Sequence, residues 1–392
     1  MKKILSFLLA AGMLIALSAC SMDFQNWGSG SAAAQSAEPA SEAVDPDHAL
    51  VPFRNPLTGE TTQEDISQNC PVAVMLNNVK EALPQSGNSQ ADMFYEIPEE
   101  GGITRIMALF QDVTGVGQIG TVRSTRPYFV RTAVGQDALL THCGGSNKAY
   151  VIIKKYMKKA GFNDIDCLDH GTNCAYRYFK RSEYRLNAGF AIENTMYIHS
   201  DNLQLFLTEK RPDIRTKHKE GYETSQLFVE DGTPENGTPA NSIDVMMSFY
   251  KHTAFQYDEA KGTYGVSEFD KPYIDEVNGE QIHVENVLIL QTDISVDEQS
   301  RLGHLRVILT GTGPGYYACN GKMIPITWRK DSVESQQHFY DMEGNELRCG
   351  IGKSFVIVVD KARDIKVDDV LLDKPADADA DHADVDTMAK VG

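Results

Sequence analysis

The sequence is short of positive charge and of long hydrophobic runs. Its 392 residues include 37 Lys and Arg against 55 Asp and Glu, which gives a formal net charge of −18. An acidic surface repels phosphate backbones, so nucleic acid is not an expected partner. The apolar run over residues 4–17 is shorter than the roughly 20 residues that span a bilayer as a helix. We therefore expect no permanent transmembrane anchor in this run.

The common hydrolase and metalloenzyme motifs are also absent. There is no G-x-S-x-G nucleophile elbow, which is the signature of many serine hydrolases. There is no H-E-x-x-H, and His142, His170 and His199 are too scattered to count as a ligand set, so we predict no metal and no other cofactor. Cys143 follows His142, but neighbouring residues on a strand point to opposite faces, so they are not expected to form an activated thiolate. A non-catalytic protein is the favoured interpretation.

Residues 1–20 have the features of a secretory signal. Lys2 and Lys3 precede the apolar run, and small residues follow it. The ending Leu-Ser-Ala-Cys resembles the bacterial lipobox, in which cleavage leaves the cysteine, here Cys20, as a lipid-modified N-terminus. The alternative is an ordinary signal peptide with a chance cysteine. Acyl chains contribute about 0.8 kcal/mol per buried CH₂, so lipidated Cys20 would anchor the protein to the extracytoplasmic face of the cell membrane.

The remaining chain divides by composition into four parts. Residues 21–50 are rich in Ser, Ala, Gly and Glu without apolar periodicity, which is typical of a flexible linker. The chain after this linker is long enough to form two domains of ordinary size. We place an N-terminal α+β domain over residues 51–225 and a mostly antiparallel β domain over residues 226–370. Residues 371–392 alternate Asp with Ala and are predicted to be a disordered acidic tail.

Apolar periodicity supports an α+β fold class. Short runs bounded by turn residues predict strands, and an amphipathic stripe ended by Gly161 predicts a helix. In the second half, Asn278-Gly279 and Asn320-Gly321 predict type I′ hairpins, because both central residues of that turn need positive φ. The predicted strands of the first half are residues 72–76, 93–97, 106–110 and 138–141, and its predicted helices are residues 149–160 and 203–210.

Several stretches together resemble one known family. Six short segments within residues 71–146 together resemble the DUF3048 family of YerB-like bacterial lipoproteins. They read PVAVMLNN, PQSG, SQADMFYE, EGGITRIMALF, GTVRSTRPYF and HCGGS. The second half resembles the C-terminal part of the same family, for example at Thr327-Trp328-Arg329-Lys330. Leu83-Pro84 departs from the family, which usually has Arg-Pro there. The resemblance implies a two-part lipoprotein of uncharacterised activity, and therefore an architecture and a location but no reaction.

The predicted binding site centres on residues 123–145. Arg123 and Arg126 stand three residues apart, and Pro127 biases Arg126 toward extended or turn geometry at the edge of a regular element. The run 138–141 leads directly into His142 and glycines, which is typical of a buried strand that ends in a loop. The predicted ligand-binding residues are Asn77, Asn78, Glu100, Arg105, Arg123, Ser124, Arg126, His142 and Ser146.

Arginine pairs favour the recognition of a planar anion. A guanidinium fork makes bidentate, charge-assisted bonds with carboxylates. We expect an anionic cell-wall or envelope-protein ligand, such as a peptidoglycan stem peptide, a muramyl carboxylate or an acidic protein segment. Two alternatives stay open: the arginines pair internally with Glu96, Glu99 or Glu100, and Asn77 and Asn78 only close a turn.

The second functional hypothesis is a cell-wall glycan hydrolase or transglycosylase. It would use Glu96 and Glu100 as a carboxylate pair, provided that the turn brings the two groups within about 5 to 10 Å of each other. Six cysteines besides Cys20 are present, and Cys167 and Cys174 are close enough in sequence to bridge one loop. Spacing alone assigns no pairing.

Overall fold

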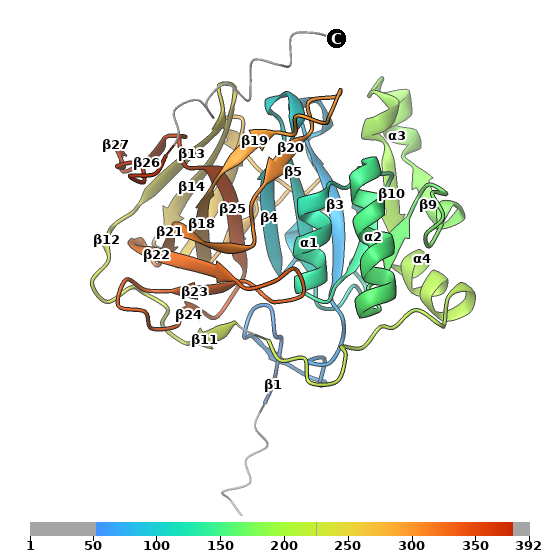
Figure 1. Ribbon diagram of the computed structural model, residues 1–392, viewed down its shortest axis with the longest axis horizontal. Coiled ribbons are helices and arrows are strands. Elements are labelled where there is room, and N and C mark those ends of the chain that lie inside the picture. The colour runs from blue at the N-terminus through green and yellow to red at the C-terminus, as the bar shows by residue number, and fades with distance from the viewer. Residues whose placement is uncertain (1–51, 225, 379–392) are drawn as a thin grey trace, which may run out of the picture. The chain divides into compact units, whose positions relative to one another are not determined.

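The structure is a computed structural model that describes residues 52–224 and 226–378 (Figure 1). The signal sequence, Cys20 and the linker expected over residues 21–50 lie outside the described residues, as does most of the expected acidic tail. No helix in the described part of the chain is long and apolar enough to cross a membrane.

An 11-stranded mixed sheet forms the centre of the fold. Its strands from the first half are β3 (Val72–Asn78), β4 (Met93–Pro98), β5 (Thr104–Phe110), β7 (Leu139–His142) and β8 (Asp164–Asp166). Those from the second half are β12 (Thr238–Pro239), β18 (Asn286–Thr292), β21 (Gly311–Cys319), β22 (Lys322–Lys330), β23 (His338–Tyr340) and β25 (Ser354–Asp360). β4 pairs in parallel with β25, with Met93 opposite Ser354. The sheet is therefore continuous across the boundary expected near residue 225.

The central strands are apolar throughout because both faces of the sheet are covered. Every residue of β3 and β5 is buried. Along β3, Val72, Val74 and Leu76 belong to one core, while Ala73 and Met75 belong to the other. Strands buried on both faces show continuous apolar runs rather than alternation, which explains why the sequence marks these strands clearly.

Helices cover one face of the first half of the sheet (Figure 1). They are α1 (Pro127–Gly135) and α2 (Asn147–Ala160), and the hairpin of β19 (Ile294–Val296) and β20 (Leu305–Val307) contributes to the same core. The Ser146 hydroxyl accepts a hydrogen bond from Ala149 N at the start of α2, and Gly161 ends the helix in the left-handed conformation. The amphipathic helix predicted over residues 149–160 is confirmed.

A second sheet and several small elements cover the opposite face. The sheet contains β13 (Ser242–Ser248), β14 (Lys251–Asp258), β15 (Thr263–Glu268), β16 (Lys271–Pro272), β17 (His283–Val284), β26 (Ile365–Val367) and β27 (Val370–Leu371). The smaller elements in this core are β6 (Gln118–Gly120), β9 (Phe179–Arg181), β10 (Met196–His199) and α4 (Ser200–Leu205), which a π-helical turn, Phe206–Lys210, continues. Phe255 of β14 packs edge-on against Phe355 of β25, with ring centroids 5.2 Å apart. Aromatic contacts of this kind hold the two layers together.

The remaining elements lie at the margins. They are α3 (Glu183–Asn187) and the strand pairs of β1 (Phe53–Arg54) with β2 (Thr61–Thr62) and β11 (Leu227–Val229) with β24 (Arg348–Gly350). Residues 371–378 of the expected tail are described, and Lys361 pairs with Asp377 at 2.6 Å. The chain therefore stays in contact with the folded part at least as far as Asp377.

The predicted fold class and most predicted elements agree with the structure. The fold is α+β, mostly sheet with a few helices, and the four strands and two helices predicted in the first half are present. Asn320 and Gly321 have φ of 48° and 70°, as a type I′ turn between β21 and β22 requires. The type I′ prediction at Asn278-Gly279 is wrong, because only Gly279 of the two has positive φ.

A buried ionic cluster lies between the two sheets. Lys251 of β14 pairs with Glu96 of β4, 3.0 Å away, and with Glu268 of β15. All three side chains are 0% exposed. Thr104 and Thr253 donate further hydrogen bonds to the Glu96 carboxylate, at 2.6 and 2.7 Å. Burial, with the nearby charge of Glu96, raises the pKa of Glu268 to about 8.

Removing the lysine should destabilise the protein strongly. Lys251→Met leaves Glu96 and Glu268 facing each other without a cation, and breaking a buried ion pair in this way costs about 3 to 5 kcal/mol. Urea unfolding monitored by circular dichroism would measure the loss. Lys366→Met on β26 is the matched control, because Lys366 is exposed. Equal free energies of unfolding for the two variants would contradict a role of Lys251 in joining the layers.

Candidate functional site

The predicted arginine segment forms the entry to α1. Arg126 has extended backbone geometry immediately before the helix, and Pro127 is its first residue. Proline suits this position because the first helical N–H has no intrahelical partner. The sequence analysis does not predict α1. The Tyr128 side chain is buried against the sheet, and its hydroxyl donates to Pro98 O at 2.8 Å, which fixes the start of the helix against the end of β4.

Arg105 lies in the interior rather than at a surface. Its guanidinium pairs with Glu99 at 2.5 Å and donates to Ser124 O, and its side chain is 3% exposed. Burial lowers the pKa of Arg105 to about 10 against the opposing charge of Glu99. The same burial raises the pKa of Glu99. Arg105 therefore connects the turn after β4 to the loop before α1, and a ligand contact for it stays a prediction.

Arg126 makes the second internal ion pair. It forms a bidentate pair with Glu100, and its Nε lies 3.6 Å from Glu99. Burial works against ionisation of Glu100, but the hydrogen bond and charge of Arg126 outweigh it, so the pKa of Glu100 is lowered. His304 approaches Glu100 at 3.8 Å from the β19–β20 hairpin. Glu100 is 23% exposed and Arg126 only 9% exposed, so little of this pair is open to solvent.

The other predicted site residues lie apart from one another and make different structural contacts. Arg123 is partly exposed and donates to Glu193 O at 3.3 Å. The Ser124 hydroxyl accepts from Arg126 at 3.0 Å. Asn77 donates to Asn194 at 2.8 Å, whereas Asn78 donates to Glu96 at 3.0 Å inside the buried cluster. Ser146 is the cap of α2.

His142 is fully buried at the end of β7. Its Nδ1 lies 2.8 Å from Gly144 O and its Nε2 lies 3.2 Å from Asp164 Oδ2, while Asp166 is 3.6 Å from Nδ1. Burial disfavours its charged form, but the two carboxylates outweigh burial and raise the pKa of His142. The structure thus brings together Glu100, Arg105, Ser124 and Arg126 and places His142, Asn77 and Asn78 elsewhere.

Glu96 and Glu100 do not form a carboxylate pair. Glu96 faces the second sheet through Lys251 and Thr253, on the same face as Phe94. Glu100 follows the end of β4 and pairs with Arg126 at the start of α1, on the helix side. Glycosidases need both carboxylates at one substrate cleft, so this geometry does not favour a glycan hydrolase.

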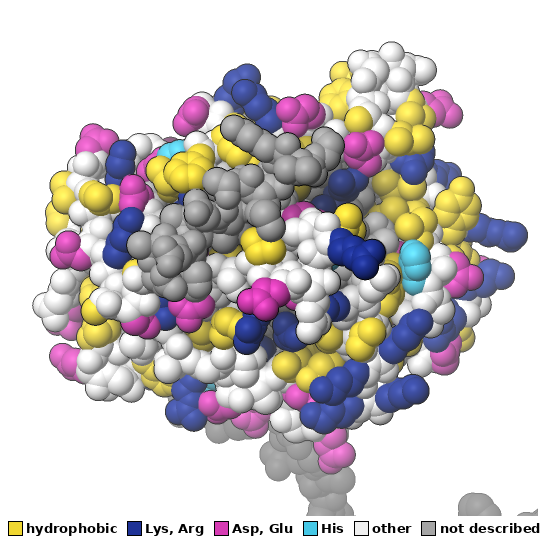
Figure 2. All heavy atoms as spheres, turned by 45° about the horizontal axis from the view of Figure 1, so that its top comes forward, with side chains coloured by type: hydrophobic (Ala, Val, Ile, Leu, Met, Phe, Trp, Pro, Cys, Tyr) yellow, Lys and Arg dark blue, Asp and Glu magenta, His cyan; other side chains and the backbone are white. Residues whose placement is uncertain are grey.

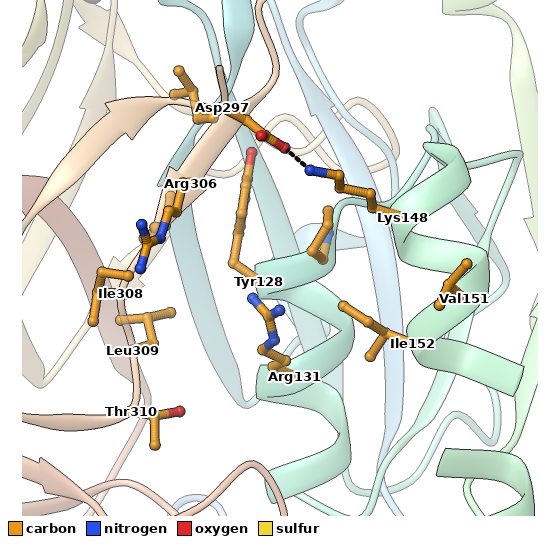
Figure 3. Close-up of a pocket in the computed structure, with 13 residues that line it drawn as sticks. Tyr128, Arg131, Lys148, Val151, Ile152, Asp297, Arg306, Ile308, Leu309 and Thr310 are labelled. Atoms are coloured by element: carbon orange, nitrogen blue, oxygen red, sulfur yellow. Dashed lines mark hydrogen bonds and ion pairs between the residues drawn. The ribbon is translucent and has the colours of Figure 1, made fainter. Parts of the chain in front are cut away.

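A cavity of about 610 Å³ lies between the two helices and the β20 segment (Figure 3). The lining residues are Pro127, Tyr128 and Arg131 of α1, Lys148, Val151 and Ile152 of α2, Asp297, and residues 305–310. Lys148 and Asp297 form an ion pair of 2.5 Å that joins α2 to the hairpin. The volume is in the usual range for a small-ligand pocket.

Arg131 and Arg306 face this cavity from opposite sides (Figure 3). Burial, and to a lesser degree the nearby charge of Arg306, lower the pKa of Arg131. No carboxylate among the described residues pairs with either guanidinium. Exposed lysines along α2 add positive charge, and Figure 2 shows basic side chains gathered toward the right of its face, the side on which Figure 1 places the helices. The cavity is thus locally cationic on a chain of net charge −18.

Sequence reasoning missed Arg131 and Arg306. Arg131 falls within residues 123–145 and lies five residues after Arg126, so a helical assignment from Pro127 would have directed attention to it. Arg306 lies 175 positions later in the chain, and only the tertiary structure brings it to α1.

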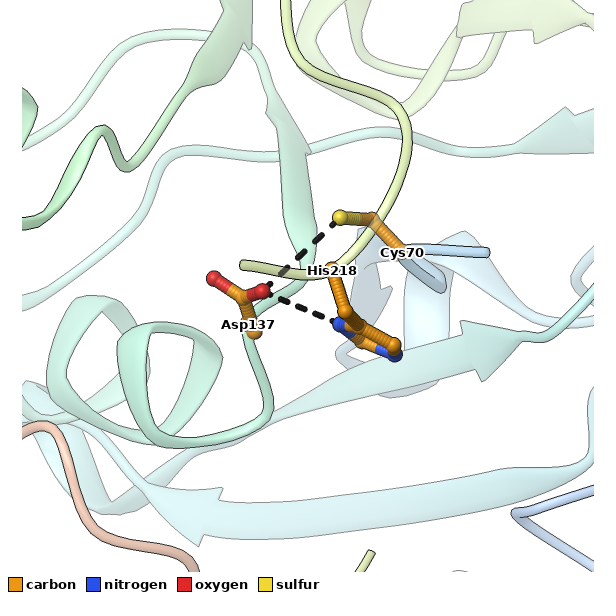
Figure 4. Close-up of side chains that lie close together, drawn as sticks. All are labelled: Cys70, Asp137 and His218. Atoms are coloured by element: carbon orange, nitrogen blue, oxygen red, sulfur yellow. Dashed lines mark hydrogen bonds and ion pairs between the residues drawn. The ribbon is translucent and has the colours of Figure 1, made fainter. Parts of the chain in front are cut away.

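A second cluster, of Cys70, Asp137 and His218, has potential ligands for a metal (Figure 4). Asp137 is 3.0 Å from His218 Nδ1, and its two oxygens accept from Arg215 at 2.8 and 2.6 Å. Arg215 also lies 3.3 Å from the Cys70 sulfur. A guanidinium therefore occupies the cation position among these groups, and the donor set does not fit a resident divalent metal.

Asp137 should make the protein sensitive to acid. Despite burial, hydrogen bonds from His218 and Arg215 lower the pKa of Asp137 to about 2. A depressed folded-state pKa stabilises the protein above about pH 4, and this contribution of about 2 kcal/mol disappears as the pH falls toward 2. Asp137→Asn should lose this stability at neutral pH and show a shallower acid dependence in urea unfolding.

The matched control for this prediction is Asp270→Asn. Asp137 and Asp270 both have positive φ, 50° and 60°, and asparagine tolerates such geometry. Asp270 is exposed. The assigned ion pair would be contradicted if Asp137→Asn and the wild type had equal free energies of unfolding at every pH from 7 to about 2.

Comparisons with known proteins place the chain in a family. The family domain described as "Protein of unknown function (DUF3048) N-terminal domain" matches residues 57–213. The corresponding "Protein of unknown function (DUF3048) C-terminal domain" matches residues 243–356. The two matches flank the expected boundary, although the central sheet continues across it.

One relative is similar in both sequence and structure. A Bacillus subtilis (strain 168) protein named "Putative lipoprotein YerB" is 27% identical over 289 residues, which cover 71% of this chain and 78% of the relative. The crystal structure of YerB protein from Bacillus subtilis superposes with a TM-score of 0.64 and 25% identity, covering 78% of this chain and 96% of that one. The relative's name is compatible with membrane anchoring. With both family domains matched in order, the chain belongs to the DUF3048 family.

Proposed function

We propose that the protein is a lipid-anchored, extracytoplasmic envelope protein that binds an anionic ligand in the cavity between α1, α2 and β20. The anchor would be the lipid on Cys20, where the lipobox-like sequence ends. The name of the Bacillus subtilis relative, a lipoprotein, supports this location. The binding role rests on the cavity.

One observation carries the binding proposal. Arg131 and Arg306 face a single cavity of about 610 Å³, and no carboxylate of the described residues neutralises either of them. Arg131 is partly buried and Arg306 is exposed, and each lowers the cost of bringing an anion into the cavity. In a chain with 18 more acidic than basic residues, leaving this pair unneutralised is a specific arrangement. An anionic ligand would neutralise this pair.

The cavity walls narrow the chemistry of the ligand. Guanidinium groups on two sides suit a carboxylate held by bidentate hydrogen bonds. Ile152, Leu305 and Leu309 supply apolar surface beside the charges. A peptide that carries a free carboxylate next to small apolar side chains matches both features. Peptidoglycan stem peptides have this chemistry and lie outside the cell membrane.

The predicted arginines would act as the support of this cavity. The pairs Arg105–Glu99 and Arg126–Glu100 fix the start of α1, and α1 carries Arg131 one turn further along. His304 contacts Glu100 from the hairpin that carries Arg306. These contacts would hold the two segments that carry Arg131 and Arg306 in place, which is part of the preorganisation that binding sites need.

Isothermal titration calorimetry tests the proposal. It measures the binding of a synthetic stem pentapeptide to the full-length protein in detergent micelles. Arg131→Gln and Arg306→Gln should each weaken binding at least about tenfold, because each removes charge-assisted hydrogen bonds worth about 1.5 to 3 kcal/mol. The same peptide with amidated carboxylates should bind the wild type correspondingly less.

Arg301→Gln is the matched control, because Arg301 is exposed and close in sequence to β20 but does not line the cavity. It should leave the affinity within about twofold of the wild type. Equal weakening by all three substitutions would indicate nonspecific attraction and would contradict the site. Binding that does not distinguish the acid from the amide would also contradict it.

A further inference from the structure

Cys143 and Cys167 occupy neighbouring positions on adjacent parallel strands. β7 and β8 pair in parallel with His142 opposite Asp166. The next residue on each strand is a cysteine, and Cys167 N donates to His142 O at 2.9 Å, which extends the ladder to this position. The backbone therefore places the two cysteines side by side, although 23 residues separate them in the sequence.

Both cysteines lie on the same face of the sheet. Cys167 belongs to the core under the second sheet, and Cys143 packs against that core. The preceding pair, His142 and Asp166, points the other way: Asp166 accepts a hydrogen bond from Tyr150 of α2 at 2.5 Å. Side chains alternate along a strand, so a pair that faces α2 must be followed by a pair that faces the other core. The orientation of His142 and Asp166 therefore agrees with the core position of the two cysteines.

The same register separates Cys174 from Cys167. Cys174 is bridged to Asp166, and Ala175 N donates to Asp166 O at 2.7 Å. Cys174 therefore lies on the face of Asp166, while Ala175 belongs to the core that contains Cys167. Cys174 is exposed. The short sequence spacing between Cys167 and Cys174 is thus misleading, since they belong to neighbouring segments and their side chains lie on opposite faces of the sheet.

The two neighbouring thiols differ in reactivity. A hydrogen bond from Cys167, together with the positive charges of His142 and Arg181, lowers the pKa of Cys143 despite its burial. The hydrogen bond to Cys143 and burial raise the pKa of Cys167. Cys143 is also the more accessible of the two, since Cys167 is fully buried. This asymmetry suits an attacking thiol beside a resolving thiol.

We propose that Cys143 and Cys167 form a modification site, a dithiol that an external disulfide oxidises to an intramolecular disulfide. The Cys143 thiolate attacks one sulfur of the external disulfide, whose bond breaks and whose leaving thiolate takes up a proton. Cys167 then attacks the Cys143 sulfur and expels the second external thiolate, which receives the proton lost by Cys167. The dithiol loses two electrons and two protons, and the external disulfide is reduced to two thiols.

The proposed bond would fix the loop that supports the arginine segment. Cys143 N donates to Arg123 O at 2.9 Å, and Thr125 N donates to Gly144 O at 2.9 Å. Oxidation would therefore tie the end of β7 to β8 directly beneath residues 123–126. This inference does not depend on the anionic ligand, because it rests on the register of β7 and β8 and on the burial of the two thiols.

Peptide mapping tests the assignment with the full-length protein in detergent micelles. The protein is reduced with dithiothreitol, desalted, incubated with oxidised glutathione and alkylated before digestion with trypsin. Cleavage after Arg131, Lys148, Lys159 and Arg177 puts Cys143 in the peptide 132–148 and both Cys167 and Cys174 in the peptide 160–177. We expect a cross-link between the two peptides, with Cys174 alkylated on fragmentation.

Two variants and a denatured sample sharpen the result. Cys174→Ser should keep the cross-link between the peptides, and Cys167→Ser should lose it. A sample oxidised by glutathione in urea is the reference, because it shows which cysteines become linked when the protein is unfolded. Three results would each overturn the proposal. They are a disulfide within the peptide 160–177, a disulfide that involves Cys174, and folded protein that stays fully alkylated while the urea sample is oxidised.

Discussion

The parallel pairing of β4 with β25 is the contact on which the rest of the structure depends. It makes one sheet from strands that are about 260 residues apart in the chain, and it requires both halves to fold together. β4 also delivers Glu96 to one face of the sheet, and Glu99 and Glu100 follow its end. The buried cluster around Lys251 and the start of α1 are therefore built from the same short stretch.

Buried ion pairs set positions in this protein more than they add stability. Taking Arg105 and Glu99 out of water costs several kcal/mol, and their attraction repays this only in good geometry. The lowered pKa of Arg105 and the raised pKa of Glu99 show that burial is the dominant influence on each. What the pairs provide is orientation, because a guanidinium with several partners holds the turn after β4 and the entry of α1 in a single arrangement.

The sequence predicts the central strands well but predicts neither α1 nor the cavity beside it, for different physical reasons. β3 and β5 are buried on both faces, so their runs are apolar without interruption. The sequence does not predict α1, because Pro127 restrains Arg126 to extended geometry but is also common at the first position of a helix. The predicted cleft arginines lie close in sequence to Glu99 and Glu100. That same proximity allowed Arg105 and Arg126 to meet Glu99 and Glu100 in the interior.

Arginines that are clustered in a motif and arginines that face a ligand need not be the same residues. A clustered arginine finds carboxylates nearby in the fold, and Arg126 is neutralised in this way by Glu100. Arg131 and Arg306 come from distant segments, and no carboxylate of the described residues pairs with either, since Asp297 beside them pairs with Lys148. The sequence motif thus supplies arginines that pair inside the fold, while the arginines of the proposed anion site are brought together only by folding. The Cys143–Cys167 pair follows the same logic, because strand register and not sequence spacing brings its two groups together.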